Sequence, residues 1–114
     1  METTQAKPDQ AVAREILRQL GGTACLAMMI GAQHFVSTPN SVRFKIPARL
    51  AKDGISLVTI RLNDMDTYDV LYQKVHALTV TTIREDKDIY CDMLVATIEE
   101  ATGLVLIPPR IRRV

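Results

Sequence analysis

The sequence lacks tryptophan and has only two phenylalanines and three tyrosines. A hydrophobic core must therefore be built mostly from isoleucine, leucine, valine, alanine and methionine. Long apolar runs are also missing: the longest, residues 24–30, has seven residues, whereas a helix that crosses a bilayer needs about 20. We therefore expect no transmembrane helix and no membrane partner.

Cysteine is scarce as well, with two residues in 114, which is too few for a disulfide framework. The beginning of the sequence, Met1–Gln5, lacks the charged and apolar regions that define a signal peptide. Together these shortages predict a reducing, cytoplasmic compartment.

What the sequence does contain is the composition of a globular protein, with 47% hydrophobic and 24% charged residues. A chain of 114 residues fits a single domain of ordinary size. We expect one domain over residues 1–114, with an N-terminal arm at 1–9, a globular core at 10–104 and a basic C-terminal tail at 105–114.

The net charge is only +1, but the charges are sorted along the chain. Residues 1–63 carry eight Lys or Arg against four Asp or Glu, residues 64–109 carry three against nine, and residues 110–114 add three arginines. This segregation predicts surface patches of opposite sign, which bear on partners rather than on the fold.

Apolar spacing predicts a helix over about residues 10–20, with Asp9 as its N-cap and Gly21 and Gly22 as its end. The apolar run at 23–30 is ambiguous between helix and strand, and its length and flanking glycines favour a strand.

The middle of the chain shows the period-two alternation of half-buried strands. In residues 42–46, for example, Val42 and Phe44 point one way and Arg43 and Lys45 the other. Similar patterns predict a meander of about five strands, whose members include residues 34–36, 42–46, 55–62, 67–72 and 78–83.

After a charged turn at residues 84–87, Asp88 is expected to cap a second helix that has Tyr90 on its apolar stripe and ends at Gly103. Residues 104–107 then suggest an edge strand. The order of elements predicts an α+β fold, in which an antiparallel sheet of about five strands carries an N-terminal and a C-terminal helix packed on one face.

Several separated strings carry a family resemblance. They are ILRQLGG at 16–22, AMMIGAQHF at 27–35, SVRFKIP at 41–47, VTIRLNDMDTYDV at 58–70, YCDML at 90–94 and TGL at 102–104. Read together, they resemble a family of small uncharacterised proteins of tailed phages and prophages. The resemblance covers residues 11–104 and implies a phage accessory protein in the cytoplasm of a bacterial host. None of the strings is a catalytic signature, so the resemblance implies no site residue.

Acidic residues offer the ligand chemistry of a divalent cation, but turns and solvated surfaces also favour aspartate. The six are Asp64, Asp66, Asp69, Glu85, Asp86 and Asp88. No pair of cysteines or histidines has zinc-site spacing, and Cys25 is expected to be a small buried hydrophobe. We therefore predict no metal, cofactor or catalytic residue.

Basic residues form the one candidate binding site. If their strands are neighbours, Arg43, Lys45 and Arg61 share a sheet face, beside Arg49 and Lys52 on the adjoining loop. The tail adds Arg110, Arg112 and Arg113. The alternative is an ordinary solvated face, and aromatic residues that would stack bases are missing from the outward positions.

Three functions follow in order of preference. The first is a non-enzymatic phage accessory protein that binds a host or phage protein and inhibits a host defence system, in the manner of an anti-CRISPR protein. The second is a nucleic-acid-binding factor of phage replication or recombination. The third is a metal-dependent nuclease. Self-association into a homo-oligomer stays open in each case.

Overall fold

The structure is a computed structural model that describes residues 11–106. The expected N-terminal arm, the Asp9 cap, Ile107 and the tail arginines Arg110, Arg112 and Arg113 lie outside the described residues. The described part has the elements α1 (Ala11–Gln19), α2 (Thr23–Ile30), β1 (Gln33–Thr38), β2 (Ser41–Lys45), the 3-10 helix η2 (Lys52–Gly54), β3 (Leu57–Leu62), β4 (Tyr68–His76), β5 (Thr79–Ile89), the 3-10 helix η3 (Cys91–Met93) and α3 (Leu94–Thr102).

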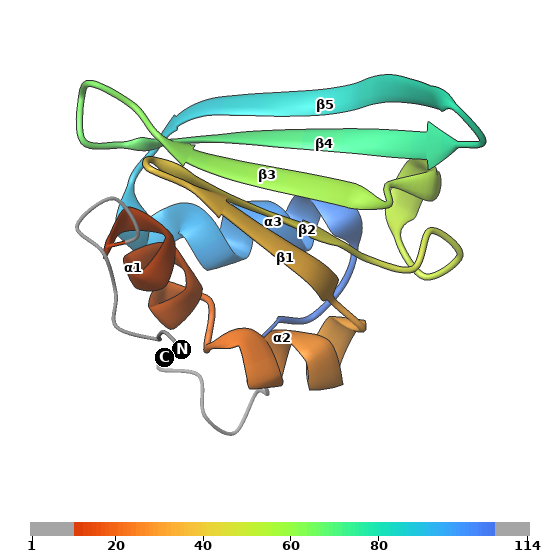
Figure 1. Ribbon diagram of the computed structural model, residues 1–114, viewed down its shortest axis with the longest axis horizontal. Coiled ribbons are helices and arrows are strands. Elements are labelled where there is room, and N and C mark those ends of the chain that lie inside the picture. The colour runs from red at the N-terminus through yellow and green to blue at the C-terminus, as the bar shows by residue number, and fades with distance from the viewer. Residues whose placement is uncertain (1–10, 107–114) are drawn as a thin grey trace.

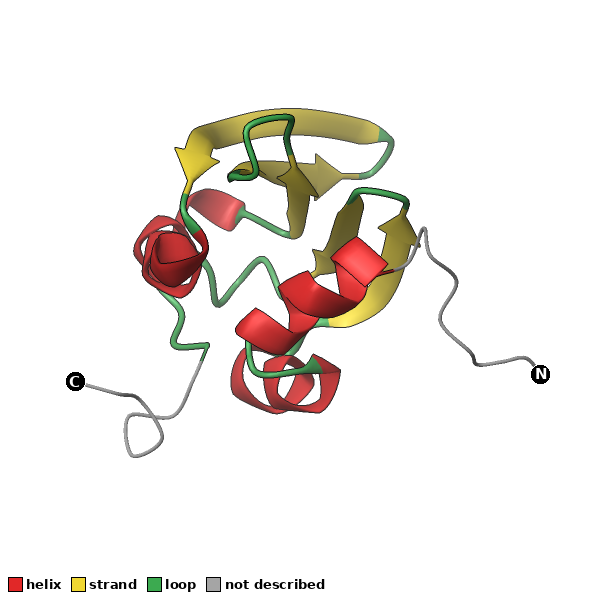
Figure 2. Cartoon of the chain, turned by 90° about the vertical axis from the view of Figure 1, so that its left-hand side faces the viewer, coloured by secondary structure: helices red, strands yellow, loops and turns green. Residues whose placement is uncertain are grey.

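The five strands form one antiparallel sheet in the order β1-β2-β3-β4-β5, so each strand pairs with its neighbour in sequence. The helices lie together on one side of this sheet (Figure 1, Figure 2). The predicted α+β fold is therefore confirmed, including the meander and the two terminal helices on one face. No helix within residues 11–106 is long and apolar enough to cross a membrane.

The core lies between the sheet and the helices. Val42 and Phe44 of β2 are 1% and 0% exposed, and Tyr72 of β4 is fully buried. The helical layer contributes Ile16 of α1 and Ile98 of α3, both fully buried. The alternation that the sequence shows in β2 therefore places its aliphatic and aromatic residues against the helices.

Residues 23–30 are helical, so the predicted strand is wrong. Alanine, leucine and methionine favour helix, and the flanking glycines act as helix termini. Gly31 adopts the left-handed conformation (φ 72°) and its N–H donates to the carbonyl of Ala27 (3.0 Å). Only Leu26 and Ile30, one helical turn apart, are buried, so this helix packs through a narrow stripe.

Residues 84–87 belong to β5 and are not a turn, which corrects a second prediction. The charges are accommodated because β5 is an edge strand whose side chains reach solvent or partners. Arg84 bridges Asp86 (3.1 Å) and Glu100 of α3 (2.8 Å) and lies over the ring of Tyr72 at 5.9 Å. Arg84 thus links α3 to the sheet.

The start of the last helix also differs from the prediction. Asp88 is the penultimate residue of β5, with φ 57°, and caps no helix. Tyr90 is 65% exposed, so it lies off the apolar stripe. Helix α3 ends at Gly103 as predicted. Residues 104–106 form no strand, but Leu106 is fully buried in the core.

Candidate binding face

The sheet has two faces, and within residues 11–106 the helices cover only one (Figure 1). We call the other the outer face. Strand register places its residues in rows that run across the strands. One row consists of Val36, Arg43, Thr59, Leu71 and Glu85. The next consists of Gln33, Lys45, Leu57, Gln73 and Thr82.

The register brings three of the candidate cations together. Arg43 and Lys45 lie two residues apart on β2, and Arg61 of β3 lies diagonal to Arg43, because Arg43 is opposite Thr59. Arg43 and Lys45 are exposed, and neither forms an ion pair with any residue in the described range 11–106. Their charges are therefore free for an external partner.

Arg61 differs from the other two because its charge is already matched. Its guanidinium donates to Asp69 of β4 at 2.8 Å. Burial alone would raise the pKa of Asp69, but hydrogen bonds from Asn63 and from the amide of Asp88, together with Arg61, outweigh it and lower that pKa. Asp69 is thus held as a carboxylate, and Arg61 contributes less free charge to the outer face.

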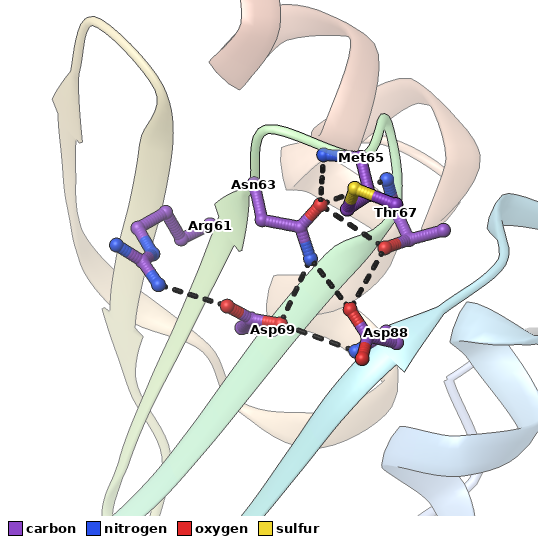
Figure 3. A network of polar contacts seen from close by, with 6 residues as sticks. All are labelled: Arg61, Asn63, Met65, Thr67, Asp69 and Asp88. Carbon is purple, nitrogen blue, oxygen red and sulfur yellow. Dashed lines mark hydrogen bonds and ion pairs between the residues drawn. The ribbon is translucent and has the colours of Figure 1, made fainter.

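Hydrogen bonds of the Asn63 side chain connect the β3–β4 turn with β4 and β5 at the end of the sheet (Figure 3). Its side-chain oxygen accepts from the amides of Met65 (2.8 Å) and Thr67 (3.2 Å), which closes the β3–β4 turn. Its amide nitrogen donates to Asp69 (3.0 Å) and to Asp88 (3.2 Å). The turn is therefore tied to both β4 and β5.

Three of the six candidate acidic residues form structural contacts, and the other three, Asp64, Asp66 and Glu85, are exposed. Asp69 and Asp88 serve the Asn63 network, and Asp86 pairs with Arg84. Among residues 11–106, no group of three or more histidine, cysteine, aspartate or glutamate side chains converges on a point that would hold a metal ion. Asn63 was not singled out from the sequence, although an asparagine that opens a turn is a known signal.

The two cations of the loop after β2, Arg49 and Lys52, have different surroundings. Lys52 donates through Nζ to the carbonyl of Glu100 (3.0 Å), and its alkyl chain lies against Gly103. It therefore sits at the C-terminal end of α3, where a positive charge stabilises the helix. Arg49 is exposed in the loop after β2.

Two adjoining hollows lie at the β1 side of the outer face. One, of about 400 Å³, is lined by His34, Val36, Arg43, Lys45 and Leu57. The second, of about 370 Å³, shares two of these residues and adds Gly31, Gln33, Ile46, Pro47, Ser56 and Val75. No aspartate or glutamate lines either hollow. The apolar floor beside the cations was not foreseen from the sequence, because it depends on which strands are neighbours.

The remaining candidates show no reactive arrangement. Cys25 is half-buried, with Sγ 3.5 Å from the carbonyl oxygen of Leu106, so it packs against the last described residue. Cys91 is exposed and makes no hydrogen bond to a histidine in the described range. His34 and His76 are both exposed and lie on β1 and β4, which two other strands separate in the sheet.

Comparisons with known proteins give no family. A scan against models of protein families, a search of curated proteins and a search of solved structures each found no match.

Proposed function

We propose that the protein is a non-enzymatic binding protein, whose outer face binds an acidic surface of a partner protein. One observation carries this proposal: Arg43 and Lys45 are exposed and unpaired within residues 11–106, and they flank the apolar side chains of Val36 and Leu57. An apolar centre with adjacent charge is the usual composition of a protein-binding patch.

The biological setting rests on the resemblance of residues 11–104 to small phage proteins. A phage accessory protein without catalytic equipment acts by occupying a surface of another molecule. We propose a component of a host defence system as the partner, so that binding inhibits it. Arg43 and Lys45 would speed the encounter with a negatively charged region of that component.

Photocrosslinking inside the bacterial host tests this proposal. A crosslinking amino acid replaces Thr59, at the centre of the outer face, and in a matched control it replaces Ala96, which is exposed on α3. We expect a discrete protein adduct from position 59 that disappears when Arg43 and Lys45 are both changed to glutamate. Equal adducts from both positions, or an adduct unaffected by the charge reversal, would overturn the proposal.

A second candidate is nucleic-acid binding, because Arg43, Lys45 and Arg61 share one face. Against it, the outer face also carries Asp69 and Glu85, and its strand positions hold no phenylalanine, tyrosine or tryptophan that could stack a base. Fluorescence anisotropy with single-stranded and duplex DNA at about 50 mM salt decides between the two. Binding that falls steeply with salt and is weakened by removing residues 110–114 would favour this candidate.

A further inference from the structure

The edge of the sheet beside the outer face offers a specific binding mode for the proposed partner. We propose that the free edge of β1 accepts an extended, acidic segment of the partner protein as an additional strand. The inference rests on the proposed function and adds to it the docking element and the conformation of the partner.

Strand β1 is at the edge of the sheet, where β2 is its only neighbour among the described strands. Opposed residues of an antiparallel ladder alternate between pairs that exchange hydrogen bonds and pairs that do not. Leu62 of β3 donates to the carbonyl of Asn40 (2.8 Å), so these two residues form a hydrogen-bonded pair. Val42, two residues further along the chain, therefore also points its N–H and C=O toward β3. Ser37, opposite Val42, therefore points its N–H and C=O away from β2, toward the free edge.

Hollows flank this edge on both sides of the sheet. Outside lies the hollow already described, with Arg43 and Lys45. Inside lies another, of about 460 Å³, between β1 and α1. Its lining includes the apolar Leu17, Phe35 and Val42, with Arg14 and Arg18 of α1 as its charged members. Val36 lines both the inner hollow and the outer one, so the two adjoin across β1.

The lining predicts the chemistry of the added strand. Neither hollow contains an aspartate or glutamate, and Arg14 makes no ion pair within residues 11–106. Side chains of an extended segment alternate between the two sides of the sheet. Carboxylates on one side would therefore lie over Arg43 and Lys45, and aliphatic side chains on the other would enter the inner hollow.

A second copy of this chain fits the edge poorly. Residues 33–38, which would pair with themselves in such a dimer, contain no acidic residue. Edge-to-edge pairing of two copies would also bring the unpaired Arg14 and Arg43 of both molecules toward one another, and like charges oppose association. Arg18 adds little to this repulsion because it is paired with Glu15 (2.6 Å). The occupant that we propose for this edge is thus an acidic segment of a different protein.

Nuclear magnetic resonance of the ¹⁵N-labelled protein tests the proposal with a short acetylated and amidated peptide that alternates valine with glutamate. We expect shifts along β1 and slower hydrogen exchange of the Ser37 amide. Ser37→Pro removes the outward N–H on an edge strand, where proline is tolerated, and should weaken binding about tenfold. Ser37→Ala, the matched control, retains this N–H and should bind as the unmodified protein does.

The outcomes separate the two proposals. If the peptide binds Ser37→Pro unchanged and leaves the exchange of the Ser37 amide unaffected, but fails on the double glutamate variant of Arg43 and Lys45, strand addition is overturned and the proposed function stands. Equal binding of a peptide with lysine in place of glutamate would overturn the acidic occupant. If Ser37→Pro does not fold, the exchange measurement on the unmodified protein decides: no slowing at millimolar peptide overturns the inference. A Ser37 amide already protected without peptide, in a protein that sediments as a dimer, would make a second copy the occupant and would also overturn it.

Discussion

The two faces of the sheet are made from the same strands, yet their side chains differ in burial. On β2, Phe44 is fully buried against the helices, whereas its neighbours Arg43 and Lys45 are exposed on the outer face. On β4, Tyr72 is fully buried and Leu71 is only half-buried. Adjacent residues thus differ in role: those of the inner face form the core, and those of the outer face belong to the surface for which we propose a partner.

The sharpest test of this division compares alanine substitutions at two adjacent residues, Arg43 and Phe44. We expect Phe44→Ala to lower the free energy of unfolding by about 3–5 kcal/mol, because it leaves a cavity under the sheet. Arg43→Ala should change it by less than about 0.5 kcal/mol. Urea titration followed by circular dichroism measures both, and similar losses for the two variants would contradict the division.

The next largest effect is expected at the end of the sheet, where a polar residue does structural work. Asn63→Ala removes the acceptor for two backbone amides and the donor to Asp69 and Asp88. We expect a loss of about 1–3 kcal/mol in the free energy of unfolding. Asp64→Ala, an exposed change in the same turn, is the matched control and should be near neutral. Equal midpoints for both variants in thermal melts would show that the network contributes nothing.

Charge reversal on the outer face should separate binding from stability. We expect the double change Arg43→Glu and Lys45→Glu to weaken the partner complex by at least about tenfold, equivalent to about 1.4 kcal/mol. The midpoint of urea unfolding should remain that of the unmodified protein. Lys52→Glu, which reverses a charge at the end of α3, should leave binding unchanged. Titration calorimetry with the partner identified by photocrosslinking measures these affinities. An equal loss of affinity from the Lys52 variant and from the double variant would argue for a non-specific charge effect.

The smallest effect concerns pH. The pKa of Asp69 is lowered in the folded protein, while the unfolded value is about 3.9. The unfolded chain then binds more protons near that pH, so the contribution of Asp69 is complete above about pH 5 and is lost as the pH falls through 4 toward the folded pKa. Asp69→Asn should flatten the dependence of stability on pH below about pH 5. An unchanged slope in acid titrations of unfolding would contradict this assignment.

Sequence patterns were sufficient for the inner face. Alternation such as that of Val42 and Phe44 reports burial directly, because every second residue must pack against the helices. Patterns were not sufficient where one composition serves two structures. The run at residues 23–30 has glycines at both ends, which suit a short strand or a capped helix. Its alanine, leucine and methionine favour the helix, and the packing of Leu26 and Ile30, one turn apart, is consistent with it.

The candidate site required information that no local pattern holds. The charged residues 84–87 lie in a strand because β4 pairs with residues 84–86. The apolar floor of Val36 and Leu57 beside Arg43 arises because β1 and β3 both pair with β2. Spacing along the chain reports which residues share one strand's face. It does not report the register between strands, which places His34 and Leu57 at the same hollow.

The meander has a consequence for the order in which the protein assembles. Every strand pairs with the strand next to it in sequence, so the sheet of residues 33–89 can form from successive antiparallel pairs that are local in sequence. The longest connection between them, residues 46–56, has eleven residues. Helix α3 and the buried Leu106 come last among the described residues, so they can cover the sheet only after its strands have been synthesised. During synthesis, the edge of β1 is complete as soon as β2 has emerged, whereas the inner face waits for the final part of the described chain.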